Sequence, residues 1–255
     1  MPISVTMKDI LGLAIADYFH GVRRRKLWVH TQSTAGSPER ARDNSRLSAS
    51  EGRTYPREEM PVKTYFRVID EMPELEWIAM QHCRGGILDI GAGAGSHSLA
   101  LQQLGQEVTA LEISPLSADV IKARGVRQVR CQDFFGLDGK EKYDTLLLMM
   151  NGIGLAGTLE GLRAFLRKAR ALLRPGGTLV FDSSDISYLY EGTPPPAPGY
   201  FGELLYQYEY RRQLSDPFHW LFIDRHTLAR ILTAEGWQME LLFEDKQDQY
   251  LVKCH

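Results

Sequence analysis

The segment ILDIGAGAGSH, residues 87–97, decides the fold of this chain. A short apolar run containing Asp89 leads into a turn in which Gly91, Gly93 and Gly95 alternate with alanine. Glycines let a backbone approach a ligand closely, and the first turn of a following helix presents free N–H groups to an anionic part of that ligand. The segment therefore predicts a strand, a tight turn and a helix, with a ligand held at the turn.

Downstream of this turn, short apolar runs alternate with helical patterns, which is typical of β-α units around a parallel sheet. We expect a helix that starts at Ser114-Pro115, a second one near residues 161–174 and a third at residues 225–235. The expected strands are residues 86–90, 107–111, 128–131, 145–150, 178–181, 237–243 and 249–253.

The pattern Asp89-x-Gly91-x-Gly93-x-Gly95 resembles the first motif of the class I S-adenosylmethionine-dependent methyltransferases. Further matches follow at the right intervals, so the resemblance covers residues 86 to the C-terminus. It implies an α/β fold with a seven-stranded, mostly parallel Rossmann-like sheet and helices on both faces. An N-terminal cap and a β-hairpin inserted after the fifth strand would complete this fold.

The resemblance also implies a cofactor, S-adenosylmethionine, with S-adenosylhomocysteine as the product, and it assigns the residues that bind it. Glu112 matches the acid that takes both ribose hydroxyls, a role that suits a group with two acceptor oxygens. Asp133 matches the residue that accepts the adenine amino group, and Phe134 would cover the ring. The full set of expected cofactor-binding residues is Asp89, Gly91, Ala92, Gly93, Gly95, Glu112, Ile113, Asp133, Phe134, Asn151 and Gly152.

Three other functions share parts of this pattern. A dinucleotide fingerprint needs GxGxxG, and counting from Gly91 places Ser96 at the sixth position, which argues against an NAD-dependent oxidoreductase. An aminopropyl transferase is disfavoured because its expected run of three consecutive glycines is missing. A non-catalytic protein that only binds the cofactor stays open, because intact cofactor motifs do not prove turnover.

The remaining parts of the chain are expected to cover the site. Residues 1–84 would form an N-terminal helical cap, with helices at 8–20 and 73–83, a strand at 60–67 and a mobile loop at 32–59, where large apolar side chains are almost absent. Residues 85–255 would form the methyltransferase domain. Within it, the insertion 186–223 would act as a lid over the substrate, and its stretches 203–211 and 218–223 would pair as a hairpin.

The substrate side is less specific in the sequence. Aromatic residues are frequent in both covering segments, and aromatic faces suit a sulfonium and a flat apolar substrate. The expected substrate-binding residues are Tyr65, Arg67, Tyr200 and Trp220, and His219 is the candidate general base. The acceptor would be a small molecule with an N, O or C nucleophile, and RNA or protein stays open as the alternative substrate.

Composition limits the partners. The formal net charge is −2, with acids and bases interspersed, so no binding of nucleic acid or of a membrane surface is expected. Cys83, Cys131 and Cys254 are far apart and show no metal-ligand spacing, so we expect no disulfide framework, no metal site and a cytoplasmic setting. No N-terminal signal segment is recognised. The oligomeric state does not follow from the sequence.

Overall fold

The structure, a computed structural model, describes residues 8–33, 56–190 and 199–255. Two sheets organise these residues. The larger one has seven strands in the order β11-β12-β7-β6-β3-β4-β5, and the smaller, antiparallel one has the path β10-β8-β1-β2 with β9 paired to β8. The seven-stranded, mostly parallel fold predicted from the sequence is confirmed.

Local sequence features fix the elements of the large sheet. Its strands are β3 (Gly86–Ile90), β4 (Glu107–Glu112), β5 (Gln128–Cys131), β6 (Tyr143–Leu148), β7 (Leu173–Ser184), β11 (Met239–Glu244) and β12 (Gln249–Cys254). The first five run parallel, whereas β12 pairs antiparallel with both β7 and β11. Buried aliphatic side chains fill these strands on both faces, as expected for a sheet that is covered on both sides.

Helices cover both faces of the large sheet. They are α2 (Glu74–Gln81), α3 (Ser96–Gln103), α4 (Pro115–Ala123), α5 (Leu159–Leu172) and α6 (Arg225–Ala234). Side chains alternate along β3, so Leu88 and Ile90 pack with Phe165 of α5, while Ile87 packs with Leu101 of α3. Ser114 caps α4 by accepting a hydrogen bond from the Ser117 amide, as its sequence predicts.

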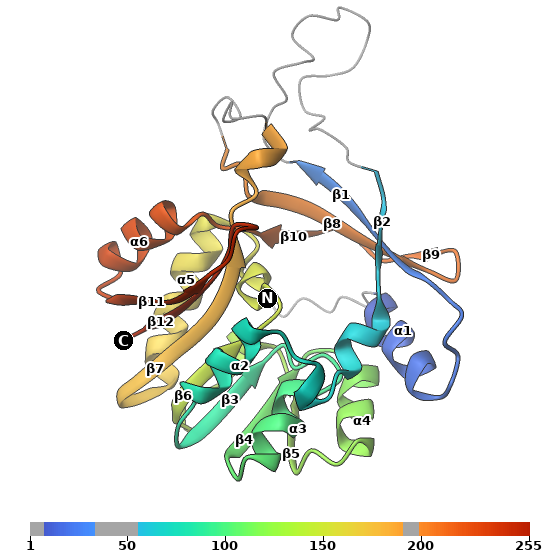
Figure 1. Cartoon of the computed structure of the whole chain (residues 1–255), viewed down its shortest axis with the longest axis horizontal. Helices are drawn as coiled ribbons and strands as arrows, with labels where there is room; N and C mark the ends of the chain where they lie inside the picture. Colours follow the sequence, from blue (N-terminus) through green and yellow to red (C-terminus); the bar gives the residue numbers. More distant parts are fainter. Residues whose placement is uncertain (1–7, 34–55, 191–198) are drawn as a thin grey trace, which may run out of the picture.

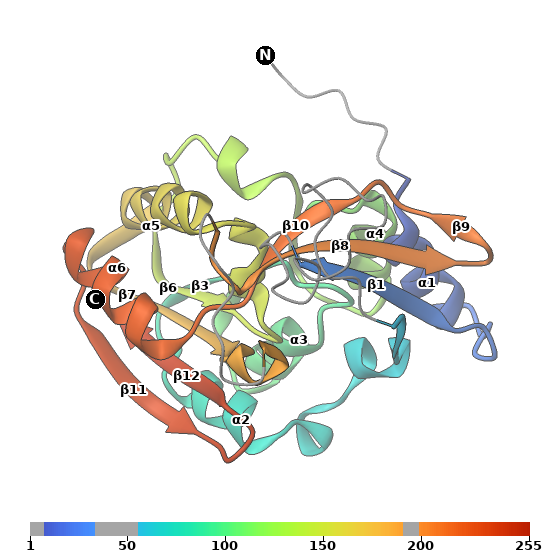
Figure 2. The ribbon, with the colours of Figure 1, turned by 90° about the horizontal axis from the view of Figure 1, so that it is seen from above.

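The antiparallel sheet combines distant segments of the chain. Its strands are β1 (Leu27–Ser33), β2 (Glu58–Met60), β8 (Glu203–Tyr210), β9 (Gln213–Leu214) and β10 (Phe218–Leu221). It arches over the end of the large sheet, and the view from above shows β8 and β10 crossing over it (Figures 1 and 2). The predicted hairpin is confirmed, because β8 pairs antiparallel with β10.

The N-terminal region differs from the helical cap that its sequence predicts. It contains α1 (Ile10–Phe19), but β1 and β2 add two strands that pair with each other. The strand expected at residues 60–67 is wrong. Pro61 has no amide hydrogen to continue the pairing, and the chain instead forms a 3-10 helix, η2 (Val62–Phe66).

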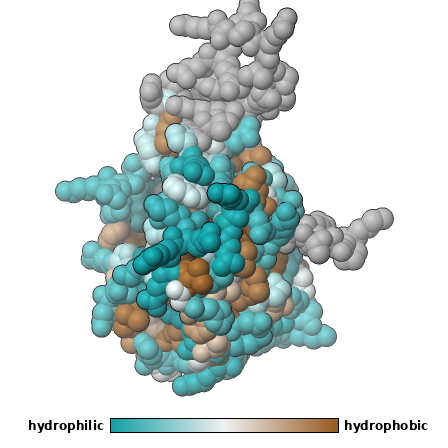
Figure 3. All heavy atoms as spheres, turned by 90° about the vertical axis from the view of Figure 1, so that its right-hand side faces the viewer, coloured by the Kyte–Doolittle hydropathy of each residue, from teal (hydrophilic) through white to brown (hydrophobic). Residues whose placement is uncertain are grey.

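Helix α1 packs against α4 and the antiparallel sheet, through Ile10, Ala14 and Ile15, which are buried with Val120 and Tyr210. On this side of the molecule hydrophilic side chains dominate the surface, interrupted by small apolar patches (Figure 3). Among the described residues, no helix has both the length and the apolar character needed to cross a membrane.

Residues 34–55, most of the loop predicted at 32–59, lie outside the described residues, as do residues 191–198 of the predicted lid.

Candidate cofactor and acceptor site

The glycine turn after β3 has the open backbone that the sequence predicts. Gly91, Gly93 and Gly95 adopt φ angles of +71°, +60° and +81°, values that strain residues with a side chain. A Cβ added at Gly91 would meet nothing within 4 Å, so the backbone there is accessible from outside. Gly95 is the N-cap residue of α3 and provides no side-chain cap. The turn can therefore present backbone N–H groups to a ligand.

Glu112 ends β4 beside this turn and is 8% exposed. One of its oxygens accepts the Gly93 amide at 2.8 Å, and the other accepts the Ser114 amide at 3.0 Å. Burial raises the pKa of Glu112 to about 7, even though these amide donors favour the ionised form. Each oxygen keeps acceptor capacity for a further donor.

The start of α1 lies against the same strand end. Asp9 caps α1 by accepting the Gly12 amide at 2.9 Å, and its second oxygen accepts the Ser114 hydroxyl at 2.5 Å. The negative charge of Asp9 also contributes to the raised pKa of Glu112. The sequence predicts the helix but not this contact, because 105 residues separate the two partners.

The segment after β5 corrects one residue of the predicted adenine site. Asp133 is exposed, so a ligand can reach its carboxylate. Phe134, however, is 4% exposed and stacks on Phe165 of α5, with ring centroids 4.6 Å apart. It therefore belongs to the core and cannot cover a ligand ring at the sheet edge. The exposed apolar side chains at this edge are Ile113, 66% exposed, and Phe135, 43% exposed.

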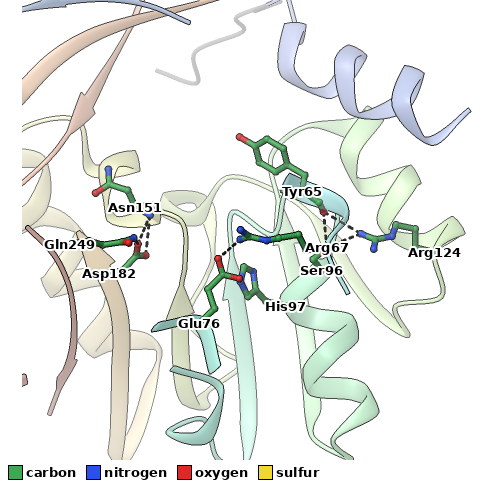
Figure 4. Close-up of polar contacts among 9 residues, drawn as sticks. All are labelled: Tyr65, Arg67, Glu76, Ser96, His97, Arg124, Asn151, Asp182 and Gln249. Atoms are coloured by element: carbon green, nitrogen blue, oxygen red, sulfur yellow. Dashed lines mark hydrogen bonds and ion pairs between the residues drawn. The ribbon is translucent and has the colours of Figure 1, made fainter. Parts of the chain in front are cut away.

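A buried charged cluster of Arg67, Glu76 and His97 lies at the start of α3 (Figure 4). Glu76 of α2 forms an ion pair with Arg67 and accepts a hydrogen bond from His97 Nε2 at 2.9 Å. Burial opposes protonation of His97, but the contacts with Glu76 outweigh burial and raise its pKa. The Nε of Arg67 is buried and has no hydrogen-bond partner among the described residues. A buried donor without a partner is costly, so this atom marks a place where a ligand acceptor would be stabilising.

Asp89 lies next to this cluster at the end of β3. It is 2% exposed and accepts the Ser98 hydroxyl at 2.6 Å. Burial raises the pKa of Asp89, while His97 and Ser98 oppose that effect. Asp89 thus stiffens the first turn of α3 from below.

Asn151 follows β6 and links three strands. Its amide donates to both carboxylate oxygens of Asp182 at 3.0 Å, and its side chain bonds the Ser183 hydroxyl and the Leu221 carbonyl. Burial raises the pKa of Asp182 to about 6. Met150 and Asn151 both have positive φ angles, 61° and 56°, which is strained for residues other than glycine. Such strain often accompanies functional loops, and Gly152 continues this one at the start of η5 (Gly152–Ala156).

Tyr65 lies on the glycine turn. A Cβ added at Gly93 would come within 2.9 Å of its ring, so only glycine leaves room for this contact. The Tyr65 carbonyl accepts the Ser96 hydroxyl at 2.7 Å, and Arg124 donates to Ser96 Oγ at 3.2 Å and to the Ala94 carbonyl. These bonds fasten η2 to the start of α3 (Figure 4).

The inner face of the antiparallel sheet is aromatic. We define this inner face by Glu58, Thr31, Tyr206, Tyr208, Phe218 and Trp220, which are brought to one side by the strand register. Tyr206 stacks on Trp220 with ring centroids 6.1 Å apart, and Phe218 contacts Tyr208 at 5.1 Å. Trp220 in turn lies against η5, because a Cβ at Gly154 would come within 2.3 Å of its ring.

Two sequence-predicted residues lie elsewhere. His219 pairs with Leu205 on the opposite side of the sheet and is exposed, so it does not point toward the inner face. The Tyr200 hydroxyl donates to the Asp224 carboxylate and accepts the Asp224 amide, both at 2.7 Å, and thereby holds the N-terminus of α6. The Tyr200 hydroxyl therefore has a structural role at the start of α6, and a contact of Tyr200 with substrate stays a prediction.

The sequence analysis missed Asp9, Glu76 and Arg124 as residues of this region. None of them belongs to a motif, and each reaches the site only through long-range packing. His97 carried a weak signal, since it directly follows the glycine turn and Ser96.

Comparisons with known proteins agree with this geometry. Residues 87–177 match the family described as "Methyltransferase domain". A solved S-adenosylmethionine-dependent methyltransferase from Bacteroides fragilis, in complex with S-adenosylhomocysteine, is 37% identical, and the match covers 97% of this chain and 94% of that chain with a TM-score of 0.81. The CcbJ methyltransferase from Streptomyces caelestis shares the fold at 18% identity, over 75% of this chain and 97% of that chain, with a TM-score of 0.57.

A curated relative is the cypemycin N-terminal methyltransferase of a Streptomyces species, which is 32% identical over 114 residues. This match covers 43% of the present chain and 46% of the relative, so it spans less than half of either protein. The Bacteroides fragilis protein, in contrast, matches over nearly its whole length. The chain therefore belongs to the class I S-adenosylmethionine-dependent methyltransferases, enzymes whose cofactor is S-adenosylmethionine.

Proposed function

We propose that this protein transfers the methyl group of S-adenosylmethionine to a small-molecule nucleophile. One observation carries the proposal: η2 and the antiparallel sheet cover the cofactor edge from two sides. Tyr65 contacts the glycine turn at Gly93, and Trp220 contacts the loop after β6 at Gly154. An acceptor must fit between these covers, which favours a small molecule over a large folded one.

The residues at the sheet edge fit the cofactor. The backbone at Gly91 leaves open the space a ligand needs, and Glu112 keeps acceptor positions for two ribose hydroxyls. Asp133 would accept the adenine amino group, with Ile113 as the apolar contact in place of Phe134. Ala92, Asn151 and Gly152 would line the methionine side, as their positions in the motifs imply.

Arg67 is the residue we assign to the cofactor's carboxylate. Its guanidinium is held at the glycine turn by Glu76, and its Nε is a buried donor with no partner among the described residues. A carboxylate would satisfy this donor and pair with the positive charge of Arg67. This role replaces the substrate contact that the sequence predicts for Arg67.

The protein's own contribution to the reaction is alignment and exclusion of water. When bound, S-adenosylmethionine supplies a methyl group that its sulfonium already activates. The chain has to place a nucleophile in line with that methyl group, and a rigid aromatic cover can do so. The role of His219 as general base stays a prediction, and its position on the outer side of the sheet gives it no path to the inner face in this conformation.

RNA and protein acceptors stay the alternative. The deciding experiment incubates the chain with S-adenosylmethionine labelled in its methyl group and a bacterial extract separated into metabolites, RNA and protein. We expect label in the metabolite fraction. Label confined to RNA or protein would contradict the small-molecule acceptor, and binding of S-adenosylhomocysteine without any transfer would indicate a regulator.

A further inference from the structure

The inner face of the antiparallel sheet carries a carboxylate, Glu58, beside its aromatic side chains. Glu58 lies opposite Val29, which in turn lies opposite Tyr208, so these three side chains share the inner face. Glu58 is exposed at the rim of the sheet, and no ion pair of its side chain is found among the described residues. Its neighbour Glu59 points to the outer face and pairs with Lys26 at 2.5 Å.

The charge of Glu58 reaches the aromatic rings. Burial, followed by the charge of Glu58, raises the pKa of Tyr206 far above its usual range. Burial, followed by the charge of Glu112, does the same for Tyr65. Tyr208 is raised likewise by burial and by its tyrosine neighbours. These phenols therefore stay neutral at physiological pH and none of them can serve as a base.

Histidines do not supply a base on this face either. In the described part of the antiparallel sheet, His30 pairs with Gln207 and His219 with Leu205, and both therefore lie on the outer face. His97 is buried and bound to Glu76 at the start of α3. The tyrosines and histidines named here therefore offer no base to an alcohol, which has to lose its proton to become a nucleophile.

Charge excludes a second class of acceptor. Carboxylates and thiolates are nucleophilic without a base. They would be repelled by Glu58, whose charge acts on Tyr206, and by Glu112, whose charge acts on Tyr65. A cationic amine meets the opposite situation. The π faces of Tyr206, Phe218 and Trp220 attract a cation, and the Glu58 carboxylate supplies the countercharge.

We propose, building on the methyltransferase function above, that the acceptor is an amine, which the inner face binds as a cation with Glu58 as its countercharge. The bound ammonium first releases one proton to water at the exposed rim, which frees the nitrogen lone pair. The nitrogen then forms the new N–C bond while the S–C bond of the sulfonium breaks, and sulfur keeps its electron pair. The products are a methylated ammonium and S-adenosylhomocysteine, so one proton is released per transfer.

The test separates a metabolite extract by cation and anion exchange at pH 7 and offers each fraction with methyl-labelled S-adenosylmethionine. We expect the label in an N-methyl product formed from the cationic fraction. 2-Phenylethylamine should inhibit this labelling at a concentration at least roughly tenfold lower than 2-phenylethanol, which has the same shape without the charge. Label in an ether, an ester or a thioether would overturn the amine while leaving the methyltransferase function intact. No label in any fraction would instead refute the methyltransferase function itself.

A matched pair of variants tests the part played by Glu58. Glu58→Gln should raise the KM for the cationic fraction roughly tenfold and leave the Kd of S-adenosylhomocysteine unchanged, because Glu58 acts on the acceptor. Glu59→Gln, one residue along on the outer face, should change neither quantity. Equal KM values for the two variants would show that Glu58 does not bind the acceptor, and a loss of S-adenosylhomocysteine binding in Glu58→Gln would assign it to the cofactor instead.

Discussion

Protonation of Glu112 favours the stability of the folded protein, whereas its ionisation favours cofactor binding. The substitution Glu112→Gln separates these two effects. Burial raises its pKa to about 7, against 4.5 for a free glutamate side chain. The folded state therefore holds this proton more tightly than the unfolded chain does. The contribution of protonated Glu112 to the free energy of unfolding is fully present below pH 4.5 and is lost as the pH rises through about 7. This contribution amounts to about 3 kcal/mol. Glutamine cannot ionise, so Glu112→Gln avoids this loss.

The same ionisation should control cofactor binding in the opposite direction. In the proposed site, ribose hydroxyls would donate to the Glu112 carboxylate. With a pKa of about 7, the ionised fraction of Glu112 is about a tenth at pH 6 and about nine tenths at pH 8. We expect the Kd of S-adenosylhomocysteine to be roughly tenfold larger at pH 6 than at pH 8 in the wild-type protein. Glu112→Gln should bind roughly thirtyfold more weakly at pH 8, for the loss of about 2 kcal/mol of charge-assisted hydrogen bonding.

Two assays check this pair of effects. Isothermal titration with S-adenosylhomocysteine between pH 6 and pH 8 gives the affinities, and urea unfolding of the ligand-free protein at pH 5 and pH 8 gives the stabilities. The variant should lose less stability than the wild type between those two pH values. The reasoning fails if the wild-type Kd is the same at pH 6 and pH 8, or if Glu112→Gln binds S-adenosylhomocysteine as tightly as the wild type does.

Two further substitutions probe the glycine turn and its neighbour. Gly93→Ala should weaken S-adenosylhomocysteine binding at least tenfold, because the new methyl group would strike the Tyr65 ring in a left-handed backbone conformation. Gly105, just after α3, is the control: its φ is +80° and an added Cβ would meet nothing within 4 Å, so Gly105→Ala introduces the backbone strain alone. Equal losses of binding in the two variants would refute a specific role for Gly93. Arg67→Met should weaken binding of S-adenosylhomocysteine but not of 5′-methylthioadenosine, which lacks the carboxylate. Equal losses for both ligands in calorimetric titrations would place the role of Arg67 in the fold around Glu76.

The sequence predicts those parts of the molecule that depend on local chemistry. Ser114 and Pro115 define the start of α4 through a cap and a fixed φ angle, which need no tertiary contact. The same holds for the left-handed turn that contains Gly91 and Gly93. Glu112 is predicted at the end of a strand, and it is the last residue of β4 in the structure.

The remaining parts depend on partners far away in the chain. Strand β1 has only a weak alternation of buried residues, and it becomes a strand because Thr31 pairs with Tyr206. Phe134 is misassigned for a different reason. It starts a 3-10 turn, where no period of two or of 3.6 indicates which of two adjacent phenylalanines faces the core. The structural role of Tyr200 could not be predicted, because its hydroxyl bonds Asp224, a contact that no motif encodes.

The division of the chain between the two sheets has an evolutionary consequence. All the residues of the inner face come from β1, β2, β8 and β10, whereas the glycine turn, Glu112, Asp133 and Asn151 come from residues 86–184. On the proposed function, substitutions on the inner face would change the acceptor and would lie in segments that hold none of the proposed ribose and adenine contacts. Exchange of residues 27–60 and 203–221 together would then change the proposed acceptor without altering the proposed cofactor contacts. Recombination of only one of these two segments would instead mismatch the pairing of β1 with β8.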